Sequence, residues 1–227
     1  MTFLIIDFNL RVTRMTQILF PTQKKYLESF RKKGDDLILE MERYADEHKV
    51  PILDWHSADF IEKLILINKP DRVLEIGTAI AYSTIRIAKC LGKKSVIHSI
   101  EKSDDNIKIA LENIEKSGLH KKIKLIHGDA LTVMPQLKKK YDFIFLDADK
   151  EDYKRLFDYS MILLRKEGVI VVDNLLWHGH AASNRVPSKY RKSTQHIKEF
   201  NKLFILQENL DSIIIPIGDG IGLGVKK

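Results

Sequence analysis

One stretch of the sequence places charged side chains directly after a run of apolar, strand-forming residues. Tyr141–Lys150 reads Y-D-F-I-F-L-D-A-D-K, so Asp147, Asp149 and Lys150 follow the strand formers at once. In open α/β sheets, ligands bind in the crevice beyond the carboxyl ends of the strands. A turn with solvated charges would explain this stretch equally well if it stood alone.

A second stretch of the same kind favours a site. Gly168–Val172 reads G-V-I-V-V and is followed by Asp173 and Asn174. Together with Asp147 these residues offer hard oxygen ligands of the kind that Mg²⁺ prefers. We therefore predict a magnesium site at these two strand ends.

The elements that must position these residues alternate between strand and helix from residue 71 onward, which indicates a parallel sheet in an α/β fold. The final two strands enclose Gly218-Asp219-Gly220, a pattern typical of an antiparallel hairpin. The predicted strands number seven and span 72–76, 95–100, 123–127, 141–146, 168–172, 212–217 and 221–225. Helices are predicted between them and would cover both faces of the sheet.

The 227 residues fit one domain, which we divide into three parts. Residues 1–21 are expected to be an N-terminal extension that need not be ordered. Residues 22–70 are expected to form cap helices, with breaks near Gly34 and at Val50-Pro51. Residues 71–227 would form the core. The cap helices and the final hairpin are the surfaces on which we expect a homodimer to form.

Composition restricts the class of protein and its partners. The single cysteine, Cys90, excludes a disulfide framework and indicates a reducing, cytoplasmic compartment. No apolar run approaches the roughly 18 residues that a membrane span needs. The formal net charge of +7 points to a polyanionic partner, although lysine-rich cytoplasmic proteins are also common.

The first three strands each end in residues suited to one cofactor. A single glycine, Gly77, follows the first strand, with Glu75 two positions before it, so a pyrophosphate-binding loop is disfavoured. Glu101 ends the second strand, where a parallel-sheet protein holds a ribose through its hydroxyls. Gly128 and Asp129 follow the third strand and could receive an adenine edge. A ligand with a cationic end, a ribose and an adenine is S-adenosylmethionine.

Three motifs carry a resemblance to a known family: V-L-E-I-G-T-A-I-A-Y-S (73–83), F-L-D-A-D-K-E-D-Y (145–153) and V-V-D-N-L-L-W-H-G (171–179). Over about residues 40–227 the sequence resembles the cation-dependent class I S-adenosylmethionine O-methyltransferases of the catechol and caffeoyl-CoA type. This resemblance implies a Rossmann-like fold and places Leu53, Ser83 and Asp147 among the cofactor-binding residues. It also supports the metal ligands above and makes Lys150 the candidate general base. The role of Asp149 stays open.

Within that family the sequence looks most like the bacterial branch that methylates 5-hydroxyuridine at the wobble position of tRNA. The block at 44–52, the block at 73–83 and I-I-P-I-G-D-G (214–220) carry this likeness, while Ala81 replaces an expected glycine. The anticodon loop of tRNA is therefore the expected substrate. The alternative is the same chemistry on a small catechol or hydroxycinnamoyl ester. A third hypothesis, an RNA-binding module with a vestigial cofactor pocket, does not explain why a complete set of catalytic residues is present.

Several residues are candidates for contact with substrate or RNA phosphate. Trp177 could stack on a base or pack beneath its loop. His178 and His180 lack a third ligand at supporting spacing, so we favour a substrate-loop or surface role over a transition-metal site. The basic candidates are Arg31, Lys32, Lys33, Arg185, Lys189, Arg191 and Lys192.

Overall fold

The computed structural model describes residues 20–32 and 34–227. Residues 1–19 of the expected extension at 1–21, and the candidate Lys33, lie outside the described residues. None of the helices in these ranges has the length and apolar character needed to cross a membrane. The α-helices are α1 (Pro21–Glu28), α2 (Asp36–His48), α3 (Trp55–Asn68), α4 (Tyr82–Cys90), α5 (Asp104–Ser117), α6 (Ala130–Val133), α7 (Tyr153–Leu163) and α8 (Arg191–Leu206). The strands are β1 (Arg72–Ile76), β2 (Val96–Glu101), β3 (Ile123–His127), β4 (Tyr141–Leu146), β5 (Leu164–Val172), β6 (Leu210–Ile215) and β7 (Ile221–Lys226).

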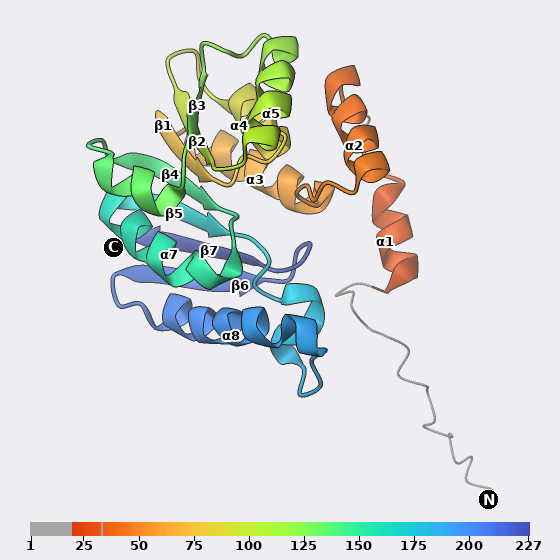
Figure 1. Cartoon of the computed structure of the whole chain (residues 1–227), viewed down its shortest axis with the longest axis vertical. Coiled ribbons are helices and arrows are strands. Elements are labelled where there is room, and N and C mark those ends of the chain that lie inside the picture. Colours follow the sequence, from red (N-terminus) through yellow and green to blue (C-terminus); the bar gives the residue numbers. More distant parts are fainter. Residues whose placement is uncertain (1–19, 33) are drawn as a thin grey trace, which may run out of the picture.

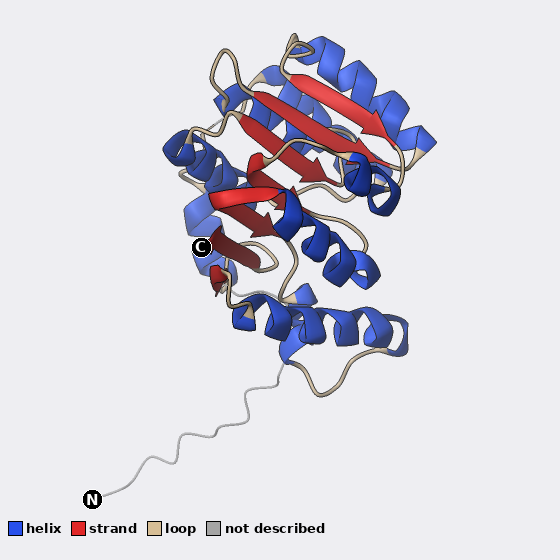
Figure 2. Ribbon diagram, turned by 90° about the vertical axis from the view of Figure 1, so that its left-hand side faces the viewer, coloured by secondary structure: helices blue, strands red, loops and turns tan. Residues whose placement is uncertain are grey.

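The strands form one seven-stranded sheet in the order β3-β2-β1-β4-β5-β7-β6 (Figure 1). The pairs from β3 to β5 are parallel, whereas β7 runs antiparallel to both β5 and β6. This arrangement confirms the predicted α/β fold with a mostly parallel sheet and a C-terminal antiparallel hairpin. Helices cover both faces of the sheet (Figure 2).

Side-chain alternation along the central strands produces two separate hydrophobic cores. Phe143 and Phe145 of β4 pack on one face with side chains from α2, α3, α4 and α5. Ile144 and Leu146 pack on the other face with side chains from α7 and α8. All six residues of β4 are buried, which is the pattern of a central parallel strand covered on both sides. This burial fixes the register of β4 and therefore the place where Asp147 emerges.

The helices begin where polar side chains satisfy the unpaired N–H groups of the first turn. Asp35 accepts a hydrogen bond from the backbone of Ile38 at 3.1 Å and starts α2. Ser103 starts α5 in the same way through the backbone of Asn106, at 3.4 Å. The segment between β5 and α8 contains two short 3₁₀ segments, Trp177–Ala182 and Ser188–Tyr190.

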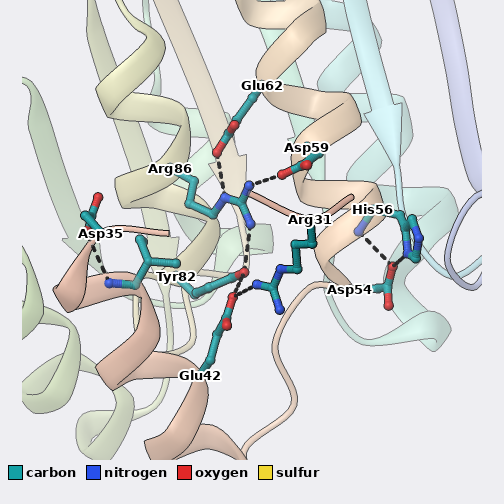
Figure 3. A network of polar contacts seen from close by, with 10 residues as sticks. Arg31, Asp35, Glu42, Asp54, His56, Asp59, Glu62, Tyr82 and Arg86 are labelled. Atoms are coloured by element: carbon teal, nitrogen blue, oxygen red, sulfur yellow. Dashed lines mark hydrogen bonds and ion pairs between the residues drawn. The ribbon is translucent and has the colours of Figure 1, made fainter. Parts of the chain in front are cut away.

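A buried arginine joins the cap helices to the core (Figure 3). Arg86 of α4 donates from Nε to Glu62 of α3 at 2.6 Å and also pairs with Asp59. Its Nη1 donates to the Tyr82 hydroxyl at 2.8 Å, which in turn donates to Glu42 of α2 at 2.6 Å. Because a buried charge is costly unless it is paired, this network specifies how α2 and α3 sit against α4.

Candidate active site

The predicted site residues meet at one edge of the sheet because the carboxyl ends of β1, β2, β3, β4 and β5 lie there. Asp147 leaves the end of β4, and its N–H donates to Ile76 O of β1 at 2.9 Å. Asp173 leaves the end of β5, and its N–H donates to Leu146 O of β4 at 3.1 Å. These backbone bonds hold the two carboxylates at adjacent strand ends, as the sequence predicted.

Lys150 lies at the centre of this group, with only 9% of its side chain exposed. Its ammonium donates to the Tyr153 hydroxyl at 2.6 Å and to Asn174 Oδ1 at 2.7 Å. It also donates to Ala148 O at 3.0 Å and to Asp147 Oδ1 at 3.3 Å. The sequence alone did not exclude a surface lysine here, and the structure shows instead a buried ammonium in contact with both predicted strand ends.

Tyr153 is a buried contact of Lys150 that sequence reasoning missed. It is fully buried, and its hydroxyl donates to Asp173 O at 3.0 Å. Burial, with the nearby Asp147 and Asp173 carboxylates, raises the pKa of Tyr153 well above its ordinary value, so the group stays a neutral phenol. Its spacing of three residues from Lys150 could have indicated that the two side chains share one face of a helical turn.

The donor set fits a hard divalent cation. Asp147 Oδ1 and Asn174 Oδ1 both accept a hydrogen bond from the Lys150 ammonium, so oxygen atoms from two strand ends already surround a positive charge here. Asp173 is 4% exposed, and burial together with Asp147 raises its pKa well above the ordinary range. A buried carboxylate such as that of Asp173 is ionised more easily beside a cation. Within the described ranges, no group of three or more His, Cys, Asp or Glu side chains is arranged to hold a metal, and this candidate consists of two carboxylates and an amide.

Asp219 is a further acidic residue at the site that the sequence analysis did not select. It lies in the turn between β6 and β7, and β6 runs parallel to β5, so this turn reaches the carboxyl edge of the sheet. Its Oδ1 accepts a hydrogen bond from the backbone N–H of His178 at 2.6 Å. Burial raises the pKa of Asp219. The glycines on either side identified a hairpin, but only the strand order places the hairpin here.

Glu75 lies in β1 and points into the interior of the protein, not toward solvent. The residue is fully buried, and its carboxylate accepts hydrogen bonds from Ser83 Oγ at 2.5 Å, from Ser99 Oγ at 2.6 Å and from the Thr84 hydroxyl. Burial raises the pKa of Glu75 to about 7, although the three hydroxyl donors favour the ionised form. The predicted cofactor residues Glu75 and Ser83 therefore contact each other directly.

The other predicted cofactor residues lie side by side along the ends of β1, β2 and β3. The Gly77 N–H donates to Ile100 O at 3.0 Å, and the Gly128 N–H donates to Glu101 O at 2.8 Å. The Glu101 carboxylate accepts from the N–H of Ala79 at 2.8 Å and from those of Lys102 and Ser103 at 2.9 and 2.8 Å. These contacts join the loop after β1 to the end of β2.

The remaining two predicted cofactor residues have different surroundings. Asp129 caps α6 by accepting from the Leu131 N–H at 2.8 Å, which ties it to the start of that helix. Leu53 is buried in the hydrophobic core on the face covered by α2 to α5. The structure thus places Asp129 at the start of α6 and Leu53 in the hydrophobic core.

The basic candidates for substrate contact are divided between paired and unpaired side chains. Arg31 pairs with Glu42 at 2.5 Å, and Lys192 pairs with Glu151 at 2.8 Å. Lys32 is exposed and lines a cavity beside the cap helices. The exposed side chains Arg185, Lys189 and Arg191 have no ion pair with a described residue, and Arg185 and Arg191 line a second cavity with Lys198 and Lys202.

A cavity of about 960 Å³ adjoins the site. Its walls come from α1, the segment that joins α1 to α2, the first turns of α2 and α3, α4, and the turn between β6 and β7. Apolar side chains on these walls include Leu27, Phe30 and Trp55, and His178 and Asp219 line the end next to the candidate metal ligands. The volume is enough for a small aromatic molecule, because ligand pockets commonly span roughly 300–1,000 Å³.

The sequence matches the model of a family described as O-methyltransferase over residues 32–227. The chain belongs to this O-methyltransferase family. Caffeoyl-CoA O-methyltransferase 3 of Nicotiana tabacum is 34% identical, with 74% of each chain covered. Catechol O-methyltransferase of Niastella koreensis is 26% identical, with 94% of this chain and 100% of that protein covered. An O-methyltransferase from Bacillus cereus, solved in complex with SAH, is 25% identical and superposes with a TM-score of 0.81, covering 91% of this chain and 97% of that one.

These relatives confirm the predicted family of this O-methyltransferase and its resemblance to the catechol and caffeoyl-CoA enzymes. They also agree with the observed fold. The two named relatives are a caffeoyl-CoA and a catechol O-methyltransferase, and neither name mentions the tRNA acceptor that the sequence put first.

Proposed function

We propose that this O-methyltransferase moves the methyl group of S-adenosylmethionine to a phenolic hydroxyl that has a second oxygen next to it, with the help of a divalent cation. The acceptor we favour is a small catechol or a hydroxycinnamoyl ester. The observation that supports this proposal most directly is the contact of the Lys150 ammonium with both Asp147 and Asn174 at two strand ends.

The roles of the chain's own residues follow from where they lie. Asp147, Asp173 and Asn174 would hold Mg²⁺, and the metal would favour the deprotonated form of the acceptor hydroxyl. Lys150 would act as the base in its neutral amine form, taking the hydroxyl proton to become an ammonium, because its Nζ lies among these oxygens. Transfer of the methyl group is then an in-line displacement whose rate depends on how well donor and acceptor are positioned.

The methyl donor is proposed from the cofactor end of the sheet. Glu101 lies where a ribose would be held, and Gly128 and Asp129 follow the adjacent strand end. The SAH bound by the Bacillus cereus relative is the form of S-adenosylmethionine left after the methyl group has gone. The same ligand in this chain would lie along the ends of β1, β2 and β3, and Gly77 at the end of β1 is in close contact with the Asp147 backbone.

A tRNA acceptor is the second candidate, supported by the exposed and unpaired basic side chains of Arg185, Lys189 and Arg191 among the described residues. 5-Hydroxyuridine also offers two adjacent oxygens. Binding of tRNA should weaken steeply as salt increases, because phosphate contacts release counterions. Turnover of a small catechol should change little over the same range, so a salt series on both substrates separates the two acceptors.

The proposal is tested with purified protein, S-adenosylmethionine and a panel that contains catechol, a caffeoyl ester and tRNA carrying 5-hydroxyuridine. Asp173→Ala should lose methyl transfer by more than about a hundredfold while its circular dichroism spectrum stays that of the wild type. Asp211→Ala is the matched control, because this exposed aspartate lies at the start of β6, away from the carboxyl edge. Wild-type activity that survives removal of divalent metal by EDTA would contradict the metal role.

A further inference from the structure

Two consecutive residues with side chains, Trp177 and His178, adopt left-handed backbone conformations near the candidate base. Trp177 has φ 49° and His178 has φ 53°, and Gly179 continues the turn with φ 79°. Residues that carry a Cβ rarely adopt this region, because the side chain approaches the following carbonyl group. Contacts from elsewhere in the fold must therefore hold the Trp177–His178 turn in place.

Those contacts come from the turn between β6 and β7. The His178 N–H donates to Asp219 Oδ1 at 2.6 Å, and the His178 ring nitrogen Nδ1 lies 3.5 Å from Asp219 Oδ2. The backbone repeats the attachment just before the turn: the Leu176 N–H donates to Asp219 O and the Leu175 N–H to Gly220 O, both at 2.9 Å. Asp219 thus accepts hydrogen bonds through its side chain and its backbone.

Asp219 can reach the Trp177–His178 turn only because the turn between β6 and β7 packs closely against Leu176. A Cβ at Gly220 would lie 2.5 Å from Leu176 Cγ and 2.8 Å from Leu176 N, and Gly220 has φ 88°. The side chain of Asp219 is 18% exposed, and its Oδ2 has no hydrogen-bond partner among the described residues. The aspartate side chain is therefore directed at the backbone of His178 rather than into solvent.

The Trp177–His178 turn determines where an indole ring lies relative to the candidate base. Lys150 Nζ lies 5.8 Å from the centre of the Trp177 ring, within the range of a cation–π contact. Trp177 also packs edge-on against Tyr190, with 6.2 Å between ring centres. The ring therefore stands beside the group that would meet the acceptor hydroxyl, in a position to contact the acceptor's aromatic ring.

We propose that Asp219 is a positioning residue for methyl transfer: its carboxylate holds the left-handed Trp177–His178 turn and so fixes the Trp177 ring against Lys150 as a wall of the acceptor site. This inference rests on the proposed function for its kinetic consequences. It assigns to Asp219 no contact with the methyl donor. Loss of the carboxylate should therefore affect the acceptor and leave binding of S-adenosylmethionine unchanged.

The test compares Asp219→Ala, which removes the acceptor of the His178 N–H bond, with Asp219→Asn, which keeps an amide oxygen for it. The matched control is Asp211→Ala on the exposed start of β6. In Asp219→Ala we expect the KM for the acceptor to rise about tenfold, the effect of losing one hydrogen bond to a charged group. The Kd for S-adenosylmethionine, measured by calorimetry, should stay that of the wild type. Asp219→Asn should recover most of the acceptor KM.

A second measurement reports on the turn without any turnover. The sequence contains two tryptophans, so in a Trp55→Phe background the fluorescence comes from Trp177. We expect Asp219→Ala to shift Trp177 emission to longer wavelength, because the released turn exposes the indole ring, and we expect Asp219→Asn not to do so. Unchanged Trp177 emission in Asp219→Ala would overturn the proposal, as would equal effects of the two variants. If no acceptor is methylated by the wild type, the proposed function fails, while the fluorescence still decides the positioning role.

Discussion

The buried Glu75 carboxyl group should make the stability of the fold depend on pH. Its pKa is about 7 in the folded protein, against 4.5 for an ordinary glutamate, because no solvent reaches it. Between these two values the folded chain keeps a proton that the unfolded chain releases. Unfolding then loses a proton, so the free energy of unfolding falls as the pH rises through this window.

The size of the effect follows from the difference between the two pKa values. A gap of about 2.5 pH units corresponds to about 3 kcal/mol of unfolding free energy, because each unit is worth about 1.4 kcal/mol. This contribution is fully present below about pH 4.5 and is lost above about pH 7. Glu75→Gln carries no titrating proton and should therefore lack it.

The assay is urea unfolding of the wild type and Glu75→Gln at a series of pH values from 4.5 to 8. The difference between their unfolding free energies should change by about 3 kcal/mol across the series, in favour of the variant at high pH. Taking the difference cancels other buried carboxyl groups such as Asp173. A difference that stays constant with pH would refute the reasoning. Ser99→Ala removes one hydroxyl that stabilises the Glu75 anion, so it should extend the window to higher pH.

Two further predictions concern the cofactor end of the sheet. Gly77→Ala should lower the free energy of unfolding by about 2–5 kcal/mol in urea denaturation, because Gly77 has φ 98° and a Cβ there would lie 1.8 Å from Asp147 O. Gly118→Ala is its control and should cost only about 1–2 kcal/mol, since Gly118 also has positive φ but no heavy atom lies within 4 Å of the added Cβ. Glu101→Gln should weaken S-adenosylmethionine binding about tenfold or more in calorimetry, because a charged acceptor for the ribose hydroxyls is lost. An unchanged Kd would remove the ribose role of Glu101.

The central sheet and the strand-end residues were predictable because burial leaves a clear pattern in the sequence. The apolar runs 143–146 in β4 and 169–172 in β5 have no polar face, which is the pattern of strands covered by helices on both sides. The first polar residue after each run therefore marks the end of the strand. Asp147, Asp173 and Asn174 were found in this way, and family resemblance added a role for Lys150. The strand β5 begins at Leu164, four residues before its predicted start at Gly168, because Leu164 pairs with Tyr141 ahead of an irregular register.

What escaped prediction depends on contacts between segments that are distant in the sequence. Asp219 reaches the site because β7 inserts between β5 and β6, and no local pattern reports that order. The sequence showed that Glu75 was acidic but not that three hydroxyls enclose it. The charges at Arg31 and Lys192 looked available for phosphate, yet each is paired with a carboxylate on another element.

The insertion of β7 has a consequence for how the protein acquires activity during synthesis. β6 is made first, but its neighbour in the sheet is β7, and until β7 emerges β5 keeps an open edge with unpaired backbone groups. The parallel half of the sheet can form earlier, together with both strand-end carboxylates. A nascent chain that stops before residue 221 would therefore hold its candidate ligands, but β7 would not yet fix the turn at 216–220 beside them. Methyltransferase activity should therefore appear late and abruptly during synthesis. A ribosome stalled within β7 should carry an inactive chain whose open β5 edge is prone to pair with other chains.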